Sequence, residues 1–136
     1  MDPATLSPAA LLRKYGLRPN KSLGQNFLVD EGALRKIVQA AEIQPDETAL
    51  EIGPGLGGLT RLLARAAARV VCVELDRALI PVLEDLLGGY PNVELVQGDI
   101  LKLDLEALLR LGPQAPAYLV VANIPYYITS ALLRRL

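Results

Sequence analysis

The feature that most constrains the fold is a glycine cluster between two apolar segments of different period. The cluster Gly53-Pro54-Gly55-Leu56-Gly57-Gly58 directly follows the apolar stretch Thr48–Ile52. After it, apolar residues recur at helical spacing from Leu59 to Ala66. Glycine permits positive φ and lets a ligand approach the backbone without a Cβ in the way. The pattern predicts a strand, a tight ligand-accepting turn and a helix.

Strands and helices continue to alternate along the chain. Further apolar strands are predicted at Val70–Val73, Val93–Val96 and Ala117–Ala122. Helical periods are predicted from Ser7 to Gly16, from Asp30 to about Pro45, after Asp76 and over Thr129–Leu136. Pro81 indicates that the helix after Asp76 starts later than Arg77. This alternation predicts an α/β fold with a Rossmann-like, doubly wound parallel sheet, in which ligands lie beyond the carboxyl ends of the strands.

Composition narrows the functions that the chain can have. The 14 Lys and Arg nearly balance the 15 Asp and Glu, so net charge does not indicate a partner. There is no histidine, so a zinc site or a His-based triad is not expected. The single cysteine, Cys72, lies in an apolar run and is interpreted as a core residue. No signal peptide or membrane span is recognisable, so we expect a cytoplasmic protein.

Basic residues are concentrated near the start of the chain. Arg13, Lys14, Arg18 and Lys21 precede Asp30, and Asp2 is the one acid among them. This basic arm could contact nucleic-acid phosphates or simply be solvated, and the sequence leaves both open.

The glycine turn and the acid at the end of the second predicted strand are the first two motifs that suit a nucleoside cofactor. Gly53, Gly55 and Gly58 fit the G-x-G-x-x-G spacing, which dinucleotide sites share. Glu74, at the end of the second strand, can accept the ribose hydroxyls of an adenosine, whereas Asp76 is interpreted as a helix cap.

The end of the third predicted strand offers groups that suit an adenine ring. Asp99 can accept a hydrogen bond from the adenine amine, and Leu75 and Ile100 can sandwich the ring.

The fourth motif, Asn123-Ile124-Pro125-Tyr126-Tyr127, decides between cofactors. The Asn123 oxygen and the Ile124 or Pro125 carbonyl can accept the two hydrogens of an exocyclic base amine, while Tyr126 stacks on the base. Asn123, Pro125 and Tyr126 are therefore the candidate catalytic residues for methylation of that nitrogen. A nicotinamide-binding domain leaves this motif unexplained.

Together these motifs resemble the ribosomal RNA adenine dimethyltransferase family, and within it the small-subunit rRNA methyltransferase A branch. The resemblance runs from Lys21 onward through Gly24–Leu28, Glu51–Gly55 and Asn123–Ser130. It implies a class I S-adenosylmethionine-dependent methyltransferase. The cofactor contacts that it implies are Asn26, Leu28, Gly53, Glu74, Asp99 and Asn123, and Phe27 helps to close the site.

The resemblance implies transfer of two methyl groups to each of two adjacent adenosines near the 3′ end of small-subunit rRNA, during ribosome assembly. The enzyme is expected to act as a monomer without membrane contact. Residues 1–29 are interpreted as an N-terminal helix and basic arm carrying the first cofactor motif, and residues 30–136 as a partial cofactor-binding domain.

Two departures from the family pattern stand out. Ala131 replaces a frequent proline, and the chain stops at Leu136, before the last strands and the C-terminal helical domain that the family has. We therefore expect an N-terminal fragment that binds cofactor but turns over poorly. The open alternatives are a macrolide-resistance methylase of large-subunit rRNA, a non-catalytic RNA-binding assembly factor, and a methyltransferase of a small molecule or protein amide.

Overall fold

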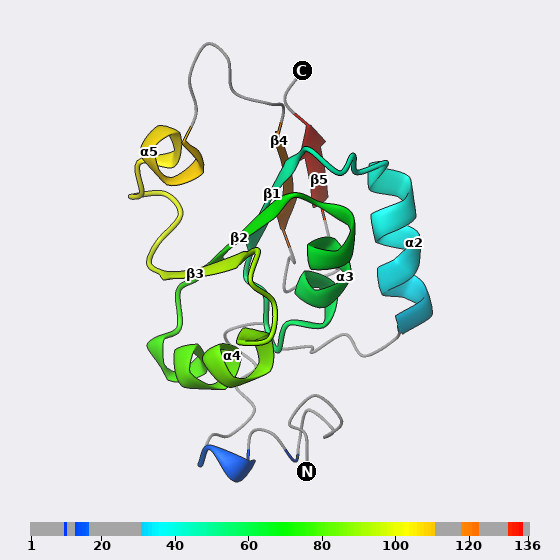
Figure 1. Cartoon of the computed structure of the whole chain (residues 1–136). Coiled ribbons are helices and arrows are strands. Elements are labelled where there is room, and N and C mark those ends of the chain that lie inside the picture. Colours follow the sequence, from blue (N-terminus) through cyan, green and yellow to red (C-terminus); the bar gives the residue numbers. More distant parts are fainter. Residues whose placement is uncertain (1–9, 11–12, 17–30, 111–117, 123–130, 135–136) are drawn as a thin grey trace.

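The computed structural model describes residues 10, 13–16, 31–110, 118–122 and 131–134. Its elements are, in order, α2 (Glu31–Ala41), β1 (Thr48–Ile52), α3 (Gly58–Ala66), β2 (Arg69–Glu74), η3 (Arg77–Leu79), α4 (Ile80–Leu87), β3 (Val93–Gln97), α5 (Leu105–Leu109), β4 (Tyr118–Ala122) and β5 (Ala131–Arg134). The strands form one sheet in the order β3-β2-β1-β4-β5 (Figure 1). β1 to β4 are parallel, as predicted, and the α/β fold class is confirmed.

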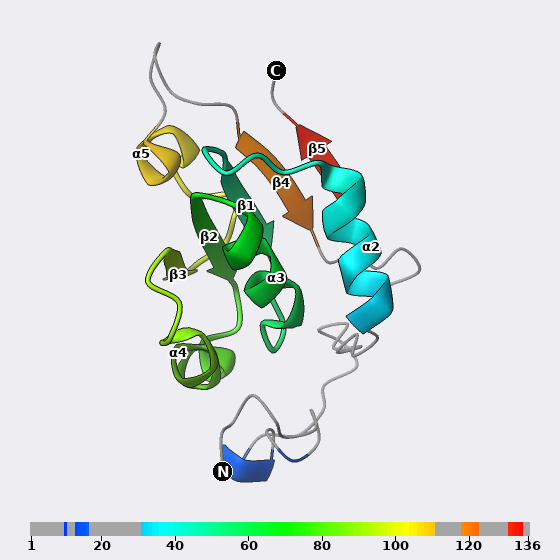
Figure 2. The same cartoon turned by 45° about the vertical axis from the view of Figure 1, so that its right-hand side comes forward.

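Helices cover both faces of the sheet. Successive side chains of a strand point to opposite faces, and apolar side chains on both faces are buried by the helices. Ala49 of β1 and Cys72 of β2 face α2 and α3 and form one core cluster with Leu63. On the opposite side, Leu50 of β1 and Val71 and Val73 of β2 pack with Leu109 of α5. Figure 2 shows α2 and α3 lying side by side along one face, with α5 beyond the other.

The helix that follows β2 begins as the sequence indicates. Asp76 caps η3 by accepting a hydrogen bond from the Ala78 N–H at 2.9 Å. The α-helical turns of α4 then start at Ile80, with Pro81 in the first turn, where its missing N–H leaves no helical bond unmade.

The prediction of helical turns over Thr129–Leu136 is wrong for Ala131–Arg134. These residues form β5, which pairs antiparallel with β4, Ala131 opposite Ala122 and Arg134 opposite Leu119. A short apolar run does not distinguish a strand from a helix by period alone. Pairing with the outer edge of β4 satisfies backbone groups that would otherwise lack ladder partners, and this long-range term decides the conformation.

The N-terminal segment is described at five residues. Ala10, Arg13 and Lys14 are helical, and Gly16 ends the turn at φ +68°, as predicted. Tyr15 packs against the α4 cluster, and its hydroxyl hydrogen-bonds the Asp85 carboxylate. Within the described part of the chain, no helix has the length and apolar character needed to cross a membrane.

Candidate cofactor site

The glycine turn after β1 has the backbone shape that its sequence predicts. Gly53, Gly55 and Gly57 have φ of +71°, +61° and +81°. The sequence spacing singled out Gly58 as the third glycine, but Gly58 is the first residue of α3 and Gly57 is the left-handed residue. A Cβ on Gly57 would lie 3.0 Å from Leu87 Cδ2. The conformation therefore favours glycine there, and a Cβ would also require the Leu87 side chain to shift.

The turn is joined by hydrogen bonds to the neighbouring strand end. The Gly53 N–H donates to the Val73 carbonyl at 3.0 Å, directly before Glu74. The Gly98 N–H in turn donates to the Glu74 carbonyl at 3.0 Å. The structure therefore places the predicted groups Gly53, Glu74 and the turn before Asp99 side by side, at the carboxyl ends of β1, β2 and β3.

Glu74 is a buried carboxylate at this edge, with 7% of its surface exposed. Burial raises its pKa, while hydrogen bonds from the Asp76 and Leu75 backbone lower it in part. The bond from the Asp76 N–H to Glu74 Oε2 measures 2.8 Å and fixes the side chain. A carboxylate held in this way can accept hydrogen bonds from ligand hydroxyls without reorganising.

The candidate adenine groups lie around the next strand end. Asp99 Oδ1 accepts a hydrogen bond from the Leu101 N–H at 2.9 Å, which shapes the turn. Leu75 is 61% exposed, and Gln97 Nε2 donates to its carbonyl at 3.0 Å. Ile100 is partly buried against the core cluster under α5. The exposed Leu75 is available to pack on an adenine ring, whereas Ile100 already contacts other protein side chains. The predicted packing of the ring between Leu75 and Ile100 stays a prediction.

β4 ends at the same edge, because Ala122 pairs with Ile52. The remaining predicted site residues lie outside the described residues: Asn26, Phe27 and Leu28 of the first motif, and Asn123, Pro125 and Tyr126 of the base motif.

Sequence reasoning missed the role of Glu51, which it took only as the start of the glycine motif. Glu51 is 1% exposed, and its Oε1 accepts hydrogen bonds from the Thr60 hydroxyl and, at 3.7 Å, from the Cys72 thiol. Burial raises its pKa to about 7, opposed by these two hydrogen bonds and reinforced by the charge of Glu74. The available signal was an acid inside an apolar strand, since such acids are rarely buried without a specific partner.

Cys72 is fully buried, which confirms its interpretation as a core residue. Burial raises the pKa of its thiol far above the usual range, so it stays protonated and can donate to Glu51.

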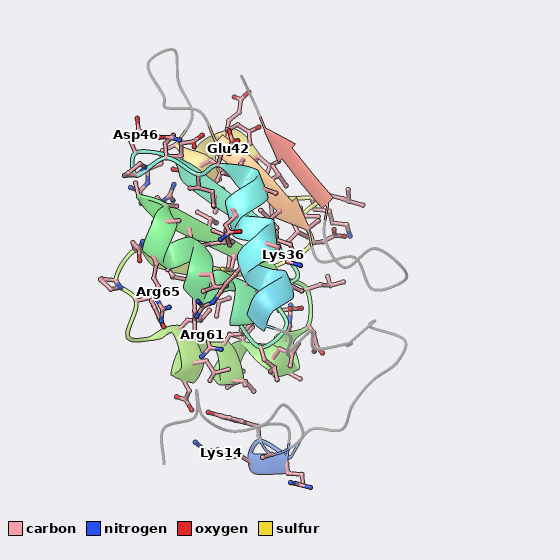
Figure 3. All side chains as sticks on the ribbon, turned by 90° about the vertical axis from the view of Figure 1, so that its right-hand side faces the viewer. Lys14, Lys36, Glu42, Asp46, Arg61 and Arg65 are labelled. Carbon is pink, nitrogen blue, oxygen red and sulfur yellow. The ribbon has the colours of Figure 1, made fainter. Side chains whose placement is uncertain are left out.

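Charged side chains are unevenly distributed on the α2 and α3 face (Figure 3). Glu42 and Asp46 lie beyond the end of α2, next to the amino ends of the strands, whereas Arg61 lies in the first turns of α3, near the glycine turn. Helix α3 carries two arginines and no acid. Arg61 therefore places one positive charge near the candidate site, whereas Arg65 lies in the last turn of α3.

A parallel sheet with a glycine turn after β1 and an acid at the end of β2 is common to folds that bind nucleoside cofactors. The solved structures that match it identify it as the class I S-adenosylmethionine-dependent methyltransferase fold. The structure of the 23S rRNA methyltransferase ErmE superposes with a TM-score of 0.57 at 32% identity, over 73% of this chain and 48% of that one. A dimethyladenosine transferase from Plasmodium falciparum gives a TM-score of 0.52 at 26% identity, over 68% of this chain and 41% of that one.

The ribosomal RNA adenine dimethylase family matches residues 16–136, so the chain belongs to that family. Ribosomal RNA small subunit methyltransferase A from Moorella thermoacetica is 52% identical over 132 residues, and that from Alkaliphilus metalliredigens is 47% identical over 126 residues. Each match covers 93% of this chain but only 46% and 44% of the relative, so the chain spans less than half the length of these proteins. The resemblance inferred from the motifs is confirmed.

Proposed function

We propose that the protein transfers methyl groups from S-adenosylmethionine to the exocyclic amines of two adjacent adenosines near the 3′ end of small-subunit rRNA. The observation that carries this is the juxtaposition of the glycine turn, Glu74 and the Asp99 turn at one edge of the sheet. The names of the relatives, which are small-subunit rRNA methyltransferases, support the choice of substrate.

The described residues fit such a cofactor. The left-handed glycines leave backbone without side chains where a ligand approaches, and buried Glu74 offers acceptors for two ribose hydroxyls. Asp99 would hold the adenine amine, with Leu75 and Ile100 against the ring, while Gly53 and Gly55 line the turn. The family motifs add Asn26, Leu28 and Asn123. When bound, the cofactor supplies an electrophilic methyl group.

The residues after β4 would hold the target base. In the proposal, the Asn123 oxygen and the Pro125 carbonyl accept the two amine hydrogens, and Tyr126 stacks on the ring. These bonds aim the nitrogen lone pair at the methyl carbon and favour pyramidal geometry there. The amine proton becomes acidic once the nitrogen is methylated, so a chain without histidine needs no strong base for the step.

The RNA partner fits the distribution of charge. In the proposal, Arg61 near the glycine turn and exposed Lys14 in the N-terminal segment contact RNA phosphates, and such contacts do not depend on base sequence. We propose that the partner is the assembling small ribosomal subunit, met in the cytoplasm by a monomeric enzyme.

The test is methyl transfer in vitro. The chain, alone and extended with the C-terminal half of the Moorella thermoacetica relative, is incubated with methyl-labelled cofactor and unmethylated small subunits, and digested rRNA is analysed for N6-dimethyladenosine. We expect efficient dimethylation by the extended protein, loss of it in its Asn123→Ala variant, and weak transfer by the chain alone. An extended protein that binds subunits but transfers no methyl group to adenosine would contradict the proposal.

The similarity to ErmE favours one second candidate, methylation of large-subunit rRNA. Supplying both subunits in the same reaction decides between the two, since label on the large subunit alone would support the alternative.

A further inference from the structure

The buried group formed by Glu51, Thr60 and Cys72 lies directly beneath the glycine turn. Glu51 precedes Gly53 by two residues on β1, and Thr60 lies in the first turn of α3, so their hydrogen bond spans the turn from one flank to the other. Thr60 and Cys72 are each fully buried. A bond that joins both flanks of a loop restricts how far they can separate.

The first turn of α3 relies on this contact. Gly57 caps the helix without a side-chain hydrogen bond, and the first turn contains no acidic residue. Glu51 therefore supplies, from the adjacent strand, a hydrogen-bond acceptor for a hydroxyl group of this first turn.

The groups around Glu51 provide little compensation for its charge. In the register of the sheet it lies between Cys72 of β2 and Val121 of β4, and α3 offers it the neutral Thr60 hydroxyl. The charged group that acts on it through space is Glu74, another acid on the same face of β2. A low-dielectric interior strengthens such interactions, so a charge bound at this edge of the sheet acts on Glu51.

We propose that Glu51 is a positioning residue: with Thr60 it fixes the glycine turn from beneath, and it releases a proton when the cationic cofactor binds above it. This inference rests on the proposed function, because S-adenosylmethionine carries a sulfonium charge that its demethylated product lacks. A cation favours the ionised form of a nearby acid. Glu51 therefore favours the methyl donor over the product when it is ionised, and its pKa of about 7 places that change near neutral pH.

The experiment is calorimetric titration of the chain with S-adenosylmethionine from pH 5.5 to 8.5, for wild type, Glu51→Gln, Thr60→Val and Thr60→Ser. The affinity ratio of wild type to Glu51→Gln should be near one at pH 5.5 and rise to about tenfold at pH 8.5, the ratio reached when binding lowers the pKa of Glu51 by about one unit. The cofactor amine and Glu74 titrate in wild type and in every variant, so their effect on affinity largely cancels in the ratio.

The threonine pair tests the clamp itself. Because the Thr60 hydroxyl lowers the pKa of Glu51, Thr60→Val should move the inflection to higher pH, and Thr60→Ser should return it. Titration in two buffers of different ionisation enthalpy should show protons released by wild type at pH 7 and fewer released by Glu51→Gln. With the demethylated product, the rise of the ratio with pH should be smaller.

The outcomes separate the two ideas. Saturable binding with an affinity ratio that does not change with pH, or identical inflections for Thr60→Val and Thr60→Ser, would overturn the role of Glu51 and leave the proposed function standing. No binding at any pH by folded wild type would overturn the proposed cofactor site, and the inference with it. Circular dichroism establishes that each variant is folded.

Discussion

The two ends of the same strands treat their carboxylates in opposite ways. At the amino ends, on the α5 face, Arg69 Nε and Nη2 bind both oxygens of Glu94 at 2.9 and 2.8 Å, and Arg110 adds a bond at 3.0 Å. These bonds lower the pKa of Glu94. At the carboxyl ends, on the opposite face, the buried acids Glu51 and Glu74 have raised pKa values, mainly through burial.

The difference indicates that the acid at the amino ends stabilises the fold, whereas the acids at the carboxyl ends belong to the candidate site. Arg69, which pairs with Glu94, also helps hold α5, since it donates a hydrogen bond to the Leu108 carbonyl at 2.9 Å. Glu51 and Glu74 carry an electrostatic cost in the protein without ligand, and a cation or a set of hydroxyls would relieve it. Acids with raised pKa values at a glycine-rich strand edge are typical of functional sites.

The largest expected effect is on the pH dependence of stability through Glu51. Its pKa rises from 4.5 to about 7 on folding. A raised pKa means that the folded state holds the proton more tightly than the unfolded state. The contribution of Glu51 to stability is therefore fully present below pH 4.5 and lost as pH rises through 7. The loss is about 3 kcal/mol at about 1.4 kcal/mol per unit. Urea unfolding from pH 4.5 to 8 should show this loss in wild type and not in Glu51→Gln.

The matched control for that series is Glu84→Gln, an exposed position on α4. Its unfolding curve should follow that of wild type at every pH. If the stability of Glu51→Gln changes with pH as that of wild type does, ionising Glu51 does not cost stability. The two ends of the strands would then not differ as described.

The next effect is at the amino ends, where Arg69→Met removes the two bonds to Glu94 and the bond to Leu108. The Arg69 side chain is 16% exposed and that of Glu94 40%. We expect a loss of about 2 kcal/mol, below the range for fully buried pairs because Glu94 keeps some water. Cofactor affinity should stay unchanged.

Arg110→Met is the control for Arg69→Met, since its side chain is 72% exposed and it makes one bond to the same acid. A loss under about 0.5 kcal/mol is expected for such a surface pair. Equal losses at the two arginines would show that burial does not set the strength of this network.

The effect of the Glu94 carboxyl on stability has the opposite dependence on pH. The lowered pKa of Glu94 gives stability that is present above its unfolded pKa, near 4.5, and lost as pH falls. Solvent at this acid screens the interaction, so the loss should stay under about 1 kcal/mol. Acid unfolding between pH 5 and 3 should be less steep in Glu94→Gln than in wild type. A steeper curve in the variant would reverse the assigned sign.

The sequence predicted the parallel sheet because strands alternate with helices across short connections. Thr48–Ile52 matches β1 residue for residue. It missed α5, although Asp104 caps that helix through the Ala107 N–H, because a five-residue helix shows little periodicity. It also missed β5, whose conformation depends on pairing with β4.

The candidate site could be predicted in part for the same reason. Gly53, Glu74 and Asp99 were predictable because each follows a strand, and parallel strands bring their carboxyl ends together. Glu51 could not be assigned, because its partner Thr60 comes from a helix and its pKa depends on burial, a property of the packed molecule.

The most direct test of the account is calorimetric titration with S-adenosylmethionine of wild type, Glu74→Ala and the surface control Glu84→Ala. We predict saturable binding by wild type and Glu84→Ala, and a loss of about 100-fold in Glu74→Ala, since each hydrogen bond to a charged group contributes about 1.5–3 kcal/mol. Equal affinity in Glu74→Ala, or no saturable binding by the folded wild-type chain, would contradict a cofactor site at the carboxyl ends of these strands.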